Sequence, residues 1–111
     1  MAAVENLARI WPPSPARKTR FSNRHARGRL GFVLLQSEET AEDDIRMAVP
    51  ADVGVFFTRS PMPDSTTVET LAGMAQDLGR AAAILPPALD AVAYVCTSGS
   101  VVIGEDRVAA E

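Results

Sequence analysis

The sequence predicts an α/β fold of three layers, in which a parallel sheet of three or four strands lies between flanking helices. Three apolar runs, rich in β-branched and aromatic residues, are each followed by a polar or amphipathic segment. Strands that alternate with helices form parallel sheets through right-handed crossovers. The 111 residues, 47% of them hydrophobic, fit one small domain with no room for a second.

The first two elements are predicted to be a strand and a short acidic helix. Residues 30–35 (LGFVLL) form an unbroken apolar run, which is typical of a strand covered on both faces. A helix is expected near residues 41–48, because its acidic residues suit the positive end of a helix dipole. Ser37 or Thr40 would be its N-cap, and Pro50 would end it.

A second strand and the longest helix follow. Residues 53–58 (VGVFFT) predict the strand, and residues 59–63 predict a loop whose prolines cannot join a ladder. The helix is expected to begin at Asp64 or Ser65 and to continue to Leu85, since apolar residues recur there at spacings of three and four. Two consecutive prolines then end it.

The third strand leads into the only cysteine. Residues 91–95 (AVAYV) predict a strand, and Cys96 follows it directly, before the small residues TSGS. Those hydroxyl residues mark a helix start, and the helix is expected to open at residues 101–103 and to break at Gly104. Parallel α/β sheets bind ligands at the carboxyl ends of their strands, so we interpret Cys96 and its neighbours as part of an active site.

The residues around Cys96 suit chemistry on a carboxylate. Thiolate is the reactive form of cysteine, and a helix N-terminus favours it. The hydroxyls of Thr97, Ser98 and Ser100, with the free amides of the helix start, would form a socket for a carboxylate. This arrangement suits proton abstraction next to the carboxylate, or addition to an activated double bond. The alternative is that Cys96 is a small core residue and that Thr97 and Ser98 only cap the helix.

Composition and charge exclude several classes of protein. Residues 1–28 carry six basic residues and one acid, and are predicted to be a disordered extension. Residues 29–111 carry five basic and 13 acidic residues, which argues against nucleic acid as the main partner. No apolar run reaches the roughly 18 residues of a membrane span. A single cysteine indicates a reducing, cytoplasmic setting, and one His with one Cys leaves no structural zinc site within this chain.

The predicted sheet is incomplete. Three parallel strands and two full helices leave at least one apolar edge and one thinly covered face. A domain spanning residues 29–111 is also close to the size at which burial barely offsets chain entropy. We therefore expect the chain to form a homo-oligomer, to pair with another chain, or to be a truncated half of a longer protein. Truncation is the favoured expectation.

Several motifs together resemble a known family. They are RLGFVLL from Arg29, ETAE from Glu39, FTR from Phe57, TVETL from Thr67 and, above all, AYVCTSGSVVIG from Ala93. In this order they resemble the N-terminal half of the aspartate/glutamate racemase superfamily. The branch of maleate cis-trans isomerases, arylmalonate decarboxylases and ectoine-utilisation proteins is the most similar. The resemblance covers about three quarters of the chain.

The resemblance implies a site between two similar α/β halves, with no metal or organic cofactor and a small carboxylate as substrate. Cys96 matches the first-half cysteine, which racemases use as an acid/base and maleate isomerases use as a nucleophile. Thr97 and Ser98 match residues that hold the substrate carboxylate. Gln36 and Ser37 lie in a loop that supplies a further carboxylate contact in the family.

Two departures from the family pattern narrow this expectation. Where isomerases commonly have Pro and Asn in the first loop, this chain has Leu35 and Glu38. An acid there would repel a second substrate carboxylate, so the loop favours an ectoine-utilisation-like protein over one acting on a dicarboxylate such as maleate. The family's second cysteine belongs to the other half, so we expect this chain to be inactive alone.

A second function class remains open beside the enzyme. It is a non-catalytic, truncated α/β domain that binds a partner through its open sheet edge. Three further side chains are given no central role. Arg59 is expected to be a solvated loop residue, Tyr94 a core residue, and His25 an idle member of the basic extension.

Overall fold

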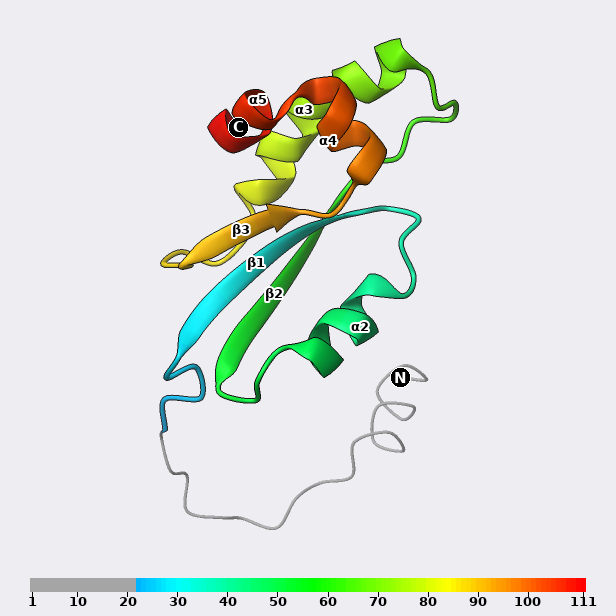
Figure 1. Ribbon diagram of the computed structural model, residues 1–111. Coiled ribbons are helices and arrows are strands. Elements are labelled where there is room, and N and C mark those ends of the chain that lie inside the picture. The colour runs from blue at the N-terminus through cyan, green and yellow to red at the C-terminus, as the bar shows by residue number, and fades with distance from the viewer. Residues whose placement is uncertain (1–21) are drawn as a thin grey trace, which may run out of the picture.

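The computed structural model describes residues 22–111 and has an α/β fold. Its sheet has three parallel strands in the order β2-β1-β3, namely β1 (Gly28–Leu35), β2 (Val53–Ser60) and β3 (Ala91–Tyr94). The central strand is therefore the first in the chain (Figure 1). The predicted fold class is confirmed.

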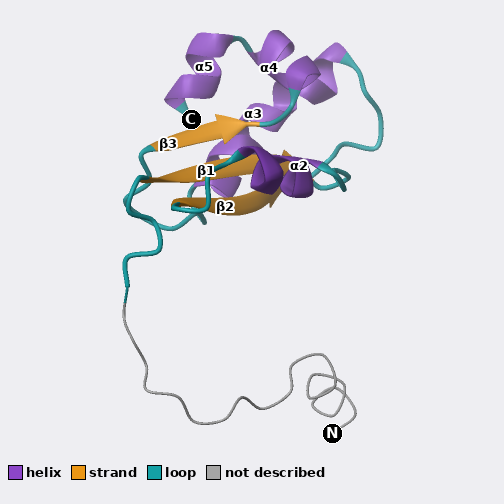
Figure 2. Ribbon diagram, turned by 60° about the horizontal axis from the view of Figure 1, so that its bottom comes forward, coloured by secondary structure: helices purple, strands orange, loops and turns teal. Residues whose placement is uncertain are grey.

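Helices cover both faces of this sheet. They are α2 (Ala41–Ala48), α3 (Val68–Ala82), α4 (Thr97–Ile103) and α5 (Glu105–Ala110). Figures 1 and 2 show α2 on one side of the sheet and the other three helices gathered on the opposite side, above β3. The result is the three-layer arrangement that alternating strands and helices produce.

The core lies between β1 and α3. Val33 of β1 is fully buried against Leu78 and Ala81 of α3, and side chains from β3 and α5 pack around them. The buried residues of α3 recur at spacings of three and four, as the amphipathic pattern predicts: Leu71, Met74, Ala75, Leu78 and Ala81. One helix face thus supplies most of the apolar burial in the described residues.

The ends of α3 differ from the prediction. Neither Asp64 nor Ser65 is its N-cap; Thr67 is, because its hydroxyl accepts from the Thr70 N–H while the Thr70 hydroxyl accepts from the Thr67 N–H. This reciprocal pair is a capping box, formed here with Thr in place of Glu or Gln. The helix ends at Ala82, three residues before Leu85.

The second strand is longer than predicted. Arg59 and Ser60 were expected in a loop, but they pair with Leu34 and Leu35 as the last two residues of β2. The loop begins only at Pro61, which directly follows β2 and has no N–H to donate to a strand ladder. The side chain of Arg59 therefore starts from a fixed backbone.

The helix after β3 begins earlier than predicted. It was expected to open at residues 101–103, yet α4 begins at Thr97 directly after Cys96, which is its N-cap. The predicted break at Gly104 is present, since this residue has a φ of 90° and separates α4 from α5. Such a backbone conformation strongly favours glycine.

Two surfaces of the sheet are thinly covered, as the incomplete architecture predicts. No residue of α2 is buried, so its face of the sheet is only partly screened. The outer edge of β3 has no strand partner among residues 22–111, and Val92 at its centre is 52% exposed. A strand edge of this kind is a place where another strand can add.

Part of the predicted basic extension lies outside the described residues. Residues 1–21 are not described, whereas residues 24–27 form a turn that leads into β1. Gly28, assigned to the extension, belongs to β1. No helix in the described part of the chain is long and apolar enough to cross a membrane.

Candidate functional site

A hollow of about 660 Å³ lies beside the carboxyl end of β3. It is lined by the end of β1, the loop after it, and the turn from β3 into α4: Leu35, Glu38, Tyr94, Val95, Cys96, Thr97, Ser98 and Ser100. We call it the Cys96 hollow. Three of the predicted site residues, Cys96, Thr97 and Ser98, thus share one cavity at the sheet edge where parallel α/β folds bind ligands.

Cys96 is held at the junction of strand and helix. It is half-buried and caps α4, because its Sγ accepts a hydrogen bond from the Gly99 N–H at 3.3 Å. Short polar side chains usually fill this position, and here the sulfur takes their place. A negative sulfur formed at this position would therefore face a backbone N–H.

Gly99 lets the chain close tightly around the sulfur. A Cβ on Gly99 would lie 2.9 Å from the Cys96 Sγ and 2.9 Å from the Tyr94 hydroxyl oxygen. Both distances are shorter than ordinary van der Waals contacts, so a side chain here would displace one of the two groups. The glycine of the TSGS segment is thus required by close approach.

Tyr94 brings a neutral hydroxyl to the same place. Its ring packs against the core, and its hydroxyl oxygen is buried with no hydrogen-bond partner among the described residues. Burial, followed by the neighbouring Cys96 sulfur, raises the pKa of Tyr94 well above its ordinary value. At neutral pH the group is therefore a protonated hydroxyl beside the Cys96 sulfur, which is more than the core role predicted for it.

Thr97 and Ser98 form the outer rim of the Cys96 hollow. Both are exposed on the first turn of α4, where backbone N–H groups have no intrahelical partner. Their hydroxyls and amides are available to a ligand in the hollow. This placement agrees with the predicted carboxylate socket.

The loop after β1 contributes different residues from those predicted. Gln36 and Ser37 are exposed and do not line the hollow; the Gln36 Oε1 instead accepts from the Met62 N–H at 3.4 Å. Leu35 and Glu38 from the same loop do line it.

Glu38 enters the hollow as a carboxylate fixed in its charged form. Its Oε1 accepts from the Thr40 N–H at 2.8 Å, the Ala41 N–H at 2.9 Å and the Thr40 hydroxyl at 3.0 Å. These bonds, led by the Thr40 N–H, lower the pKa of Glu38. Thr40 is the N-cap residue of α2, one of the two expected, but its side chain makes no cap bond, and the Glu38 carboxylate accepts from the Thr40 and Ala41 N–H groups instead.

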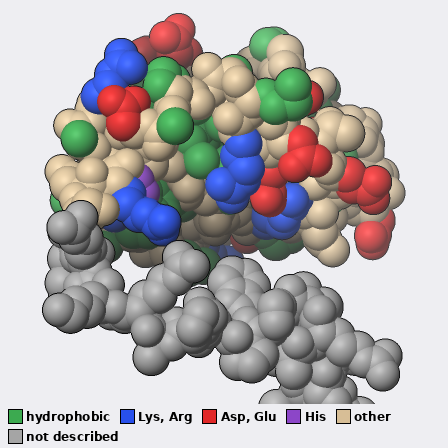
Figure 3. Space-filling model, turned by 90° about the horizontal axis from the view of Figure 1, so that it is seen from below, with side chains coloured by type: hydrophobic (Ala, Val, Ile, Leu, Met, Phe, Trp, Pro, Cys, Tyr) green, Lys and Arg blue, Asp and Glu red, His purple; other side chains and the backbone are tan. Residues whose placement is uncertain are grey.

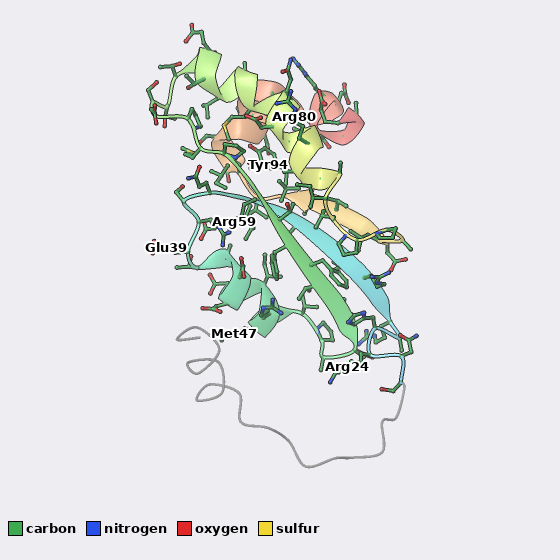
Figure 4. The ribbon with its side chains drawn as sticks, turned by 180° about the vertical axis from the view of Figure 1, so that it is seen from behind. Arg24, Glu39, Met47, Arg59, Arg80 and Tyr94 are labelled. Carbon is green, nitrogen blue, oxygen red and sulfur yellow. The ribbon has the colours of Figure 1, made fainter. Side chains whose placement is uncertain are left out.

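Arg59 is exposed, as expected, but it also binds this loop. Its Nη1 donates to the backbone oxygens of Leu35 at 2.8 Å and Glu38 at 2.6 Å, and its Nη2 pairs with the Glu42 carboxylate at 2.7 Å. Figure 4 shows Arg59 between the end of β2 and α2. Its charge is therefore engaged by the protein.

The sequence does contain a signal that places Tyr94 beside Cys96. Tyr94 and Cys96 are two residues apart in an extended segment, and such residues point to the same side. The sequence marked Glu38 only as an acid in the first loop, because its contact with the α2 amides depends on the loop conformation. Among residues 22–111, no group of three or more metal-ligating side chains is found.

Comparisons with known proteins identify no relative: no family model, no curated protein and no solved structure matches this chain.

Proposed function

We propose that this chain provides the N-terminal half of a cofactor-independent enzyme of the racemase, isomerase or decarboxylase type, acting at the carbon next to a carboxylate. The observation that carries the proposal is the Cys96 hollow, which brings together a thiol, a neutral buried phenol and two exposed hydroxyls. The order of motifs around Cys96 supports the same assignment. In this function Cys96 is the acid/base or nucleophile.

The proposed step begins with the substrate carboxylate on the rim of the hollow. Hydroxyl and amide donors of Thr97 and Ser98 hold its oxygens, and the Cys96 thiolate takes the proton from the adjacent carbon. The new S–H bond forms as the C–H bond breaks, and the electron pair moves into the carboxylate as an enediolate. The Tyr94 hydroxyl donates to the developing negative charge. A second acid, which the other half of the enzyme would supply, then protonates the opposite face of this carbon as the electron pair returns from the enediolate to form the new C–H bond, and the Cys96 thiol later loses its proton to solvent.

Glu38 narrows the class of substrate. An ionised carboxylate already faces the hollow, so a second negative group on the substrate would meet a like charge. Leu35 and Val95 offer apolar surface beside it. We therefore propose a monocarboxylate with an apolar substituent, in place of a dicarboxylate such as maleate.

The setting proposed for this enzyme is the cytoplasm. Cys96 is the only cysteine of the sequence, and the mechanism needs it as a free thiol. A reducing compartment keeps it so. The step needs no metal or organic cofactor.

Alkylation of Cys96 tests this function. Because the chain has one cysteine, iodoacetamide labelling followed by mass spectrometry reports on this site alone. Phenylacetate is expected to slow labelling, and the neutral phenylacetamide is not. Thr97→Val should weaken the protection by phenylacetate about fivefold, the effect of one lost hydrogen bond.

Thr66→Val is the matched control, since Thr66 is exposed and does not line the hollow. It should leave both labelling and protection unchanged. Equal protection by phenylacetate and phenylacetamide, or protection that survives Thr97→Val together with Ser98→Ala, would contradict the proposal.

The open edge of β3 favours a second candidate function, a non-catalytic domain that associates with a second copy of itself. Ala91, Val92 and Ala93 are exposed and uncharged, with none of the charged or proline residues that usually protect a sheet edge. Beside them lies an apolar hollow of about 400 Å³ between β3, α3 and α5. Two such edges can pair antiparallel about a two-fold axis without placing like charges opposite each other.

Sedimentation of the chain distinguishes the two candidates. Edge pairing predicts a dimer that Val92→Lys converts to a monomer, with no effect on carboxylate protection of Cys96. A monomer at all concentrations would contradict edge pairing and leave the enzyme proposal intact.

A further inference from the structure

A second hollow lies at the opposite end of the sheet from Cys96. It has a volume of about 350 Å³ and is lined by the turn before β1, the end of α2 and the start of β2: Arg24, His25, Arg46, Ala51, Val53, Gly54 and Val55. We call it the arginine hollow. Figure 4 shows Arg24 at the end of the molecule away from Tyr94 and Arg59, and Figure 3 shows arginine side chains beside the histidine there.

The ring of His25 is held in this hollow by its packing against Gly54 of β2. A Cβ on Gly54 would lie within 2.7 to 2.8 Å of three atoms of the His25 ring, so the ring occupies the space that a side chain would fill. The edge of the ring also meets Phe56, with ring centroids 5.4 Å apart and planes at 87°. His25 is therefore a placed residue and not an idle part of a basic extension.

Two arginines face the arginine hollow without a carboxylate partner. The guanidinium of Arg46 lies 5.0 Å from the centre of the Phe57 ring, which orients it. Neither Arg24 nor Arg46 forms an ion pair with a carboxylate of residues 22–111, and Asp52, between two lining residues, pairs with Arg27 at 3.6 Å. No Asp or Glu lines the hollow itself.

Backbone groups add donors to the same place. β2 is an edge strand, so its outward-facing backbone groups near Val55 have no strand partner among the described residues, whereas the Val53 N–H donates to the Pro50 oxygen at 3.0 Å. Unpaired N–H groups beside arginines are a common setting for oxyanions. Guanidinium forks match the oxygens of phosphate in particular.

We propose that the arginine hollow binds a small phosphate-bearing molecule. A phosphate monoester carries close to two negative charges at neutral pH, which two unpaired guanidiniums match. The volume is at the lower limit of ligand pockets and suits a phosphate with a small substituent. This site is independent of the enzyme proposed above, because the two hollows share no residue.

Titration of the full chain with inorganic phosphate at constant ionic strength, followed by amide NMR spectra, tests the proposal. Saturable shifts are expected at His25, Gly54 and Val55. Arg24→Gln and Arg46→Gln should each weaken phosphate binding about tenfold, because each removes charged donors. Arg46→Lys should weaken it too, since lysine keeps the charge and loses the fork.

Arg80→Gln is the matched control. It removes the same charge from an arginine on α3 that is 78% exposed and outside the arginine hollow. Phosphate binding should not change in this variant. Because Arg24 is an exposed side chain with no ion pair in the described chain, its variant keeps the proposal testable if Arg46→Gln does not fold.

Three results would overturn the proposal. They are the absence of saturable shifts at His25 and Gly54, an Arg80→Gln effect as large as that of Arg24→Gln, and wild-type affinity in both hollow variants. A single-stranded oligonucleotide that binds far more tightly than phosphate, and loses affinity in the same variants, would assign the surface to nucleic acid instead.

Discussion

Tyr94 adds to the Cys96 hollow a group that the sequence analysis assigned only to the core. As a strand residue it contributes its ring to the core, yet its hydroxyl lies beside the sulfur with no partner of its own. An unpaired buried donor destabilises a folded protein, and it persists where a ligand can satisfy it. This hydroxyl therefore acts on the Cys96 sulfur beside it, the nearest acceptor in the hollow.

The titration of Tyr94 can be followed without interference, because the sequence has one tyrosine. In the native chain, tyrosinate absorbance should appear at higher pH than in the urea-unfolded chain, since burial raises the pKa of Tyr94. The sign for stability follows: the folded state holds the proton longer, so the free energy of unfolding should fall as pH rises above about 10. Identical titration curves in the two states would contradict the buried position.

The Glu38 carboxylate is predicted to stabilise the fold in a pH-dependent way. The pKa of Glu38 is lowered by the amide and hydroxyl bonds it accepts, so it stabilises the fold above its ordinary pKa and loses this effect as pH falls through the lowered value. Glu38→Gln should lower the unfolding midpoint at neutral pH and reduce the loss of stability in acid. Glu39→Gln, the exposed neighbour, should do neither. Urea unfolding across the acid range measures both variants, and equal midpoints for the two would refute the role.

At the scale of elements, the turn from β3 into α4 decides the geometry of the site. Its early start at Thr97 depends on one hydrogen bond from Gly99 to the Cys96 sulfur and on the absence of a Cβ at Gly99. A sequence pattern records only that small and hydroxyl residues occur there. The position of the sulfur as a cap depends on the backbone of the turn, which the pattern does not contain.

Two glycine-to-alanine substitutions distinguish the effect of tight packing at Gly99 from the effect of helix propensity at Gly73. Gly99→Ala should destabilise the chain by about 1–3 kcal/mol, because the new methyl group overpacks the Cys96 sulfur and the Tyr94 hydroxyl. Gly73→Ala should stabilise it by about 0.5–1 kcal/mol, since Gly73 lies within α3 and a Cβ there meets nothing within 4 Å. Thermal unfolding compares them, and a neutral Gly99→Ala would contradict the tight turn.

Element types were predictable where burial is regular, and element ends were not. The apolar runs of β1 and β2 and the periodic face of α3 follow from side-chain alternation and spacing, which depend on the chain alone. The Thr67–Thr70 capping box and the extension of β2 to Ser60 depend on local hydrogen bonds. Several neighbouring residues of similar type could form such bonds, so the sequence pattern does not show which of them caps the helix or ends the strand.

At the scale of the whole molecule, the two ends of one sheet carry different chemistry. The carboxyl end holds the Cys96 hollow with a thiol, hydroxyls and one ionised acid. The amino end holds the arginine hollow, which has no acid in its lining. The sequence indicated the first, because ligand sites at strand ends follow from topology, and it missed the second, because His25 meets Gly54 only after β2 is placed.

The candidate site was predicted in part for the same reason. Cys96, Thr97 and Ser98 are consecutive, so a strand that ends at Tyr94 places all three at one edge. Gln36 and Ser37 lie in the loop after β1, and they do not line the hollow, whereas Leu35 at the end of β1 and Glu38 of the loop do. The fixed carboxylate of Glu38 came from this loop geometry, which is set by contacts with Arg59 and the start of α2.

The most direct test of the central claim, that the Cys96 hollow is a carboxylate site, is a titration of the full chain with phenylacetate followed by amide NMR spectra. We expect saturable shifts at Thr97, Ser98 and Gly99 that phenylacetamide does not cause, with no change at His25. Equal responses to the two compounds, or shifts confined to residues outside the hollow, would contradict it.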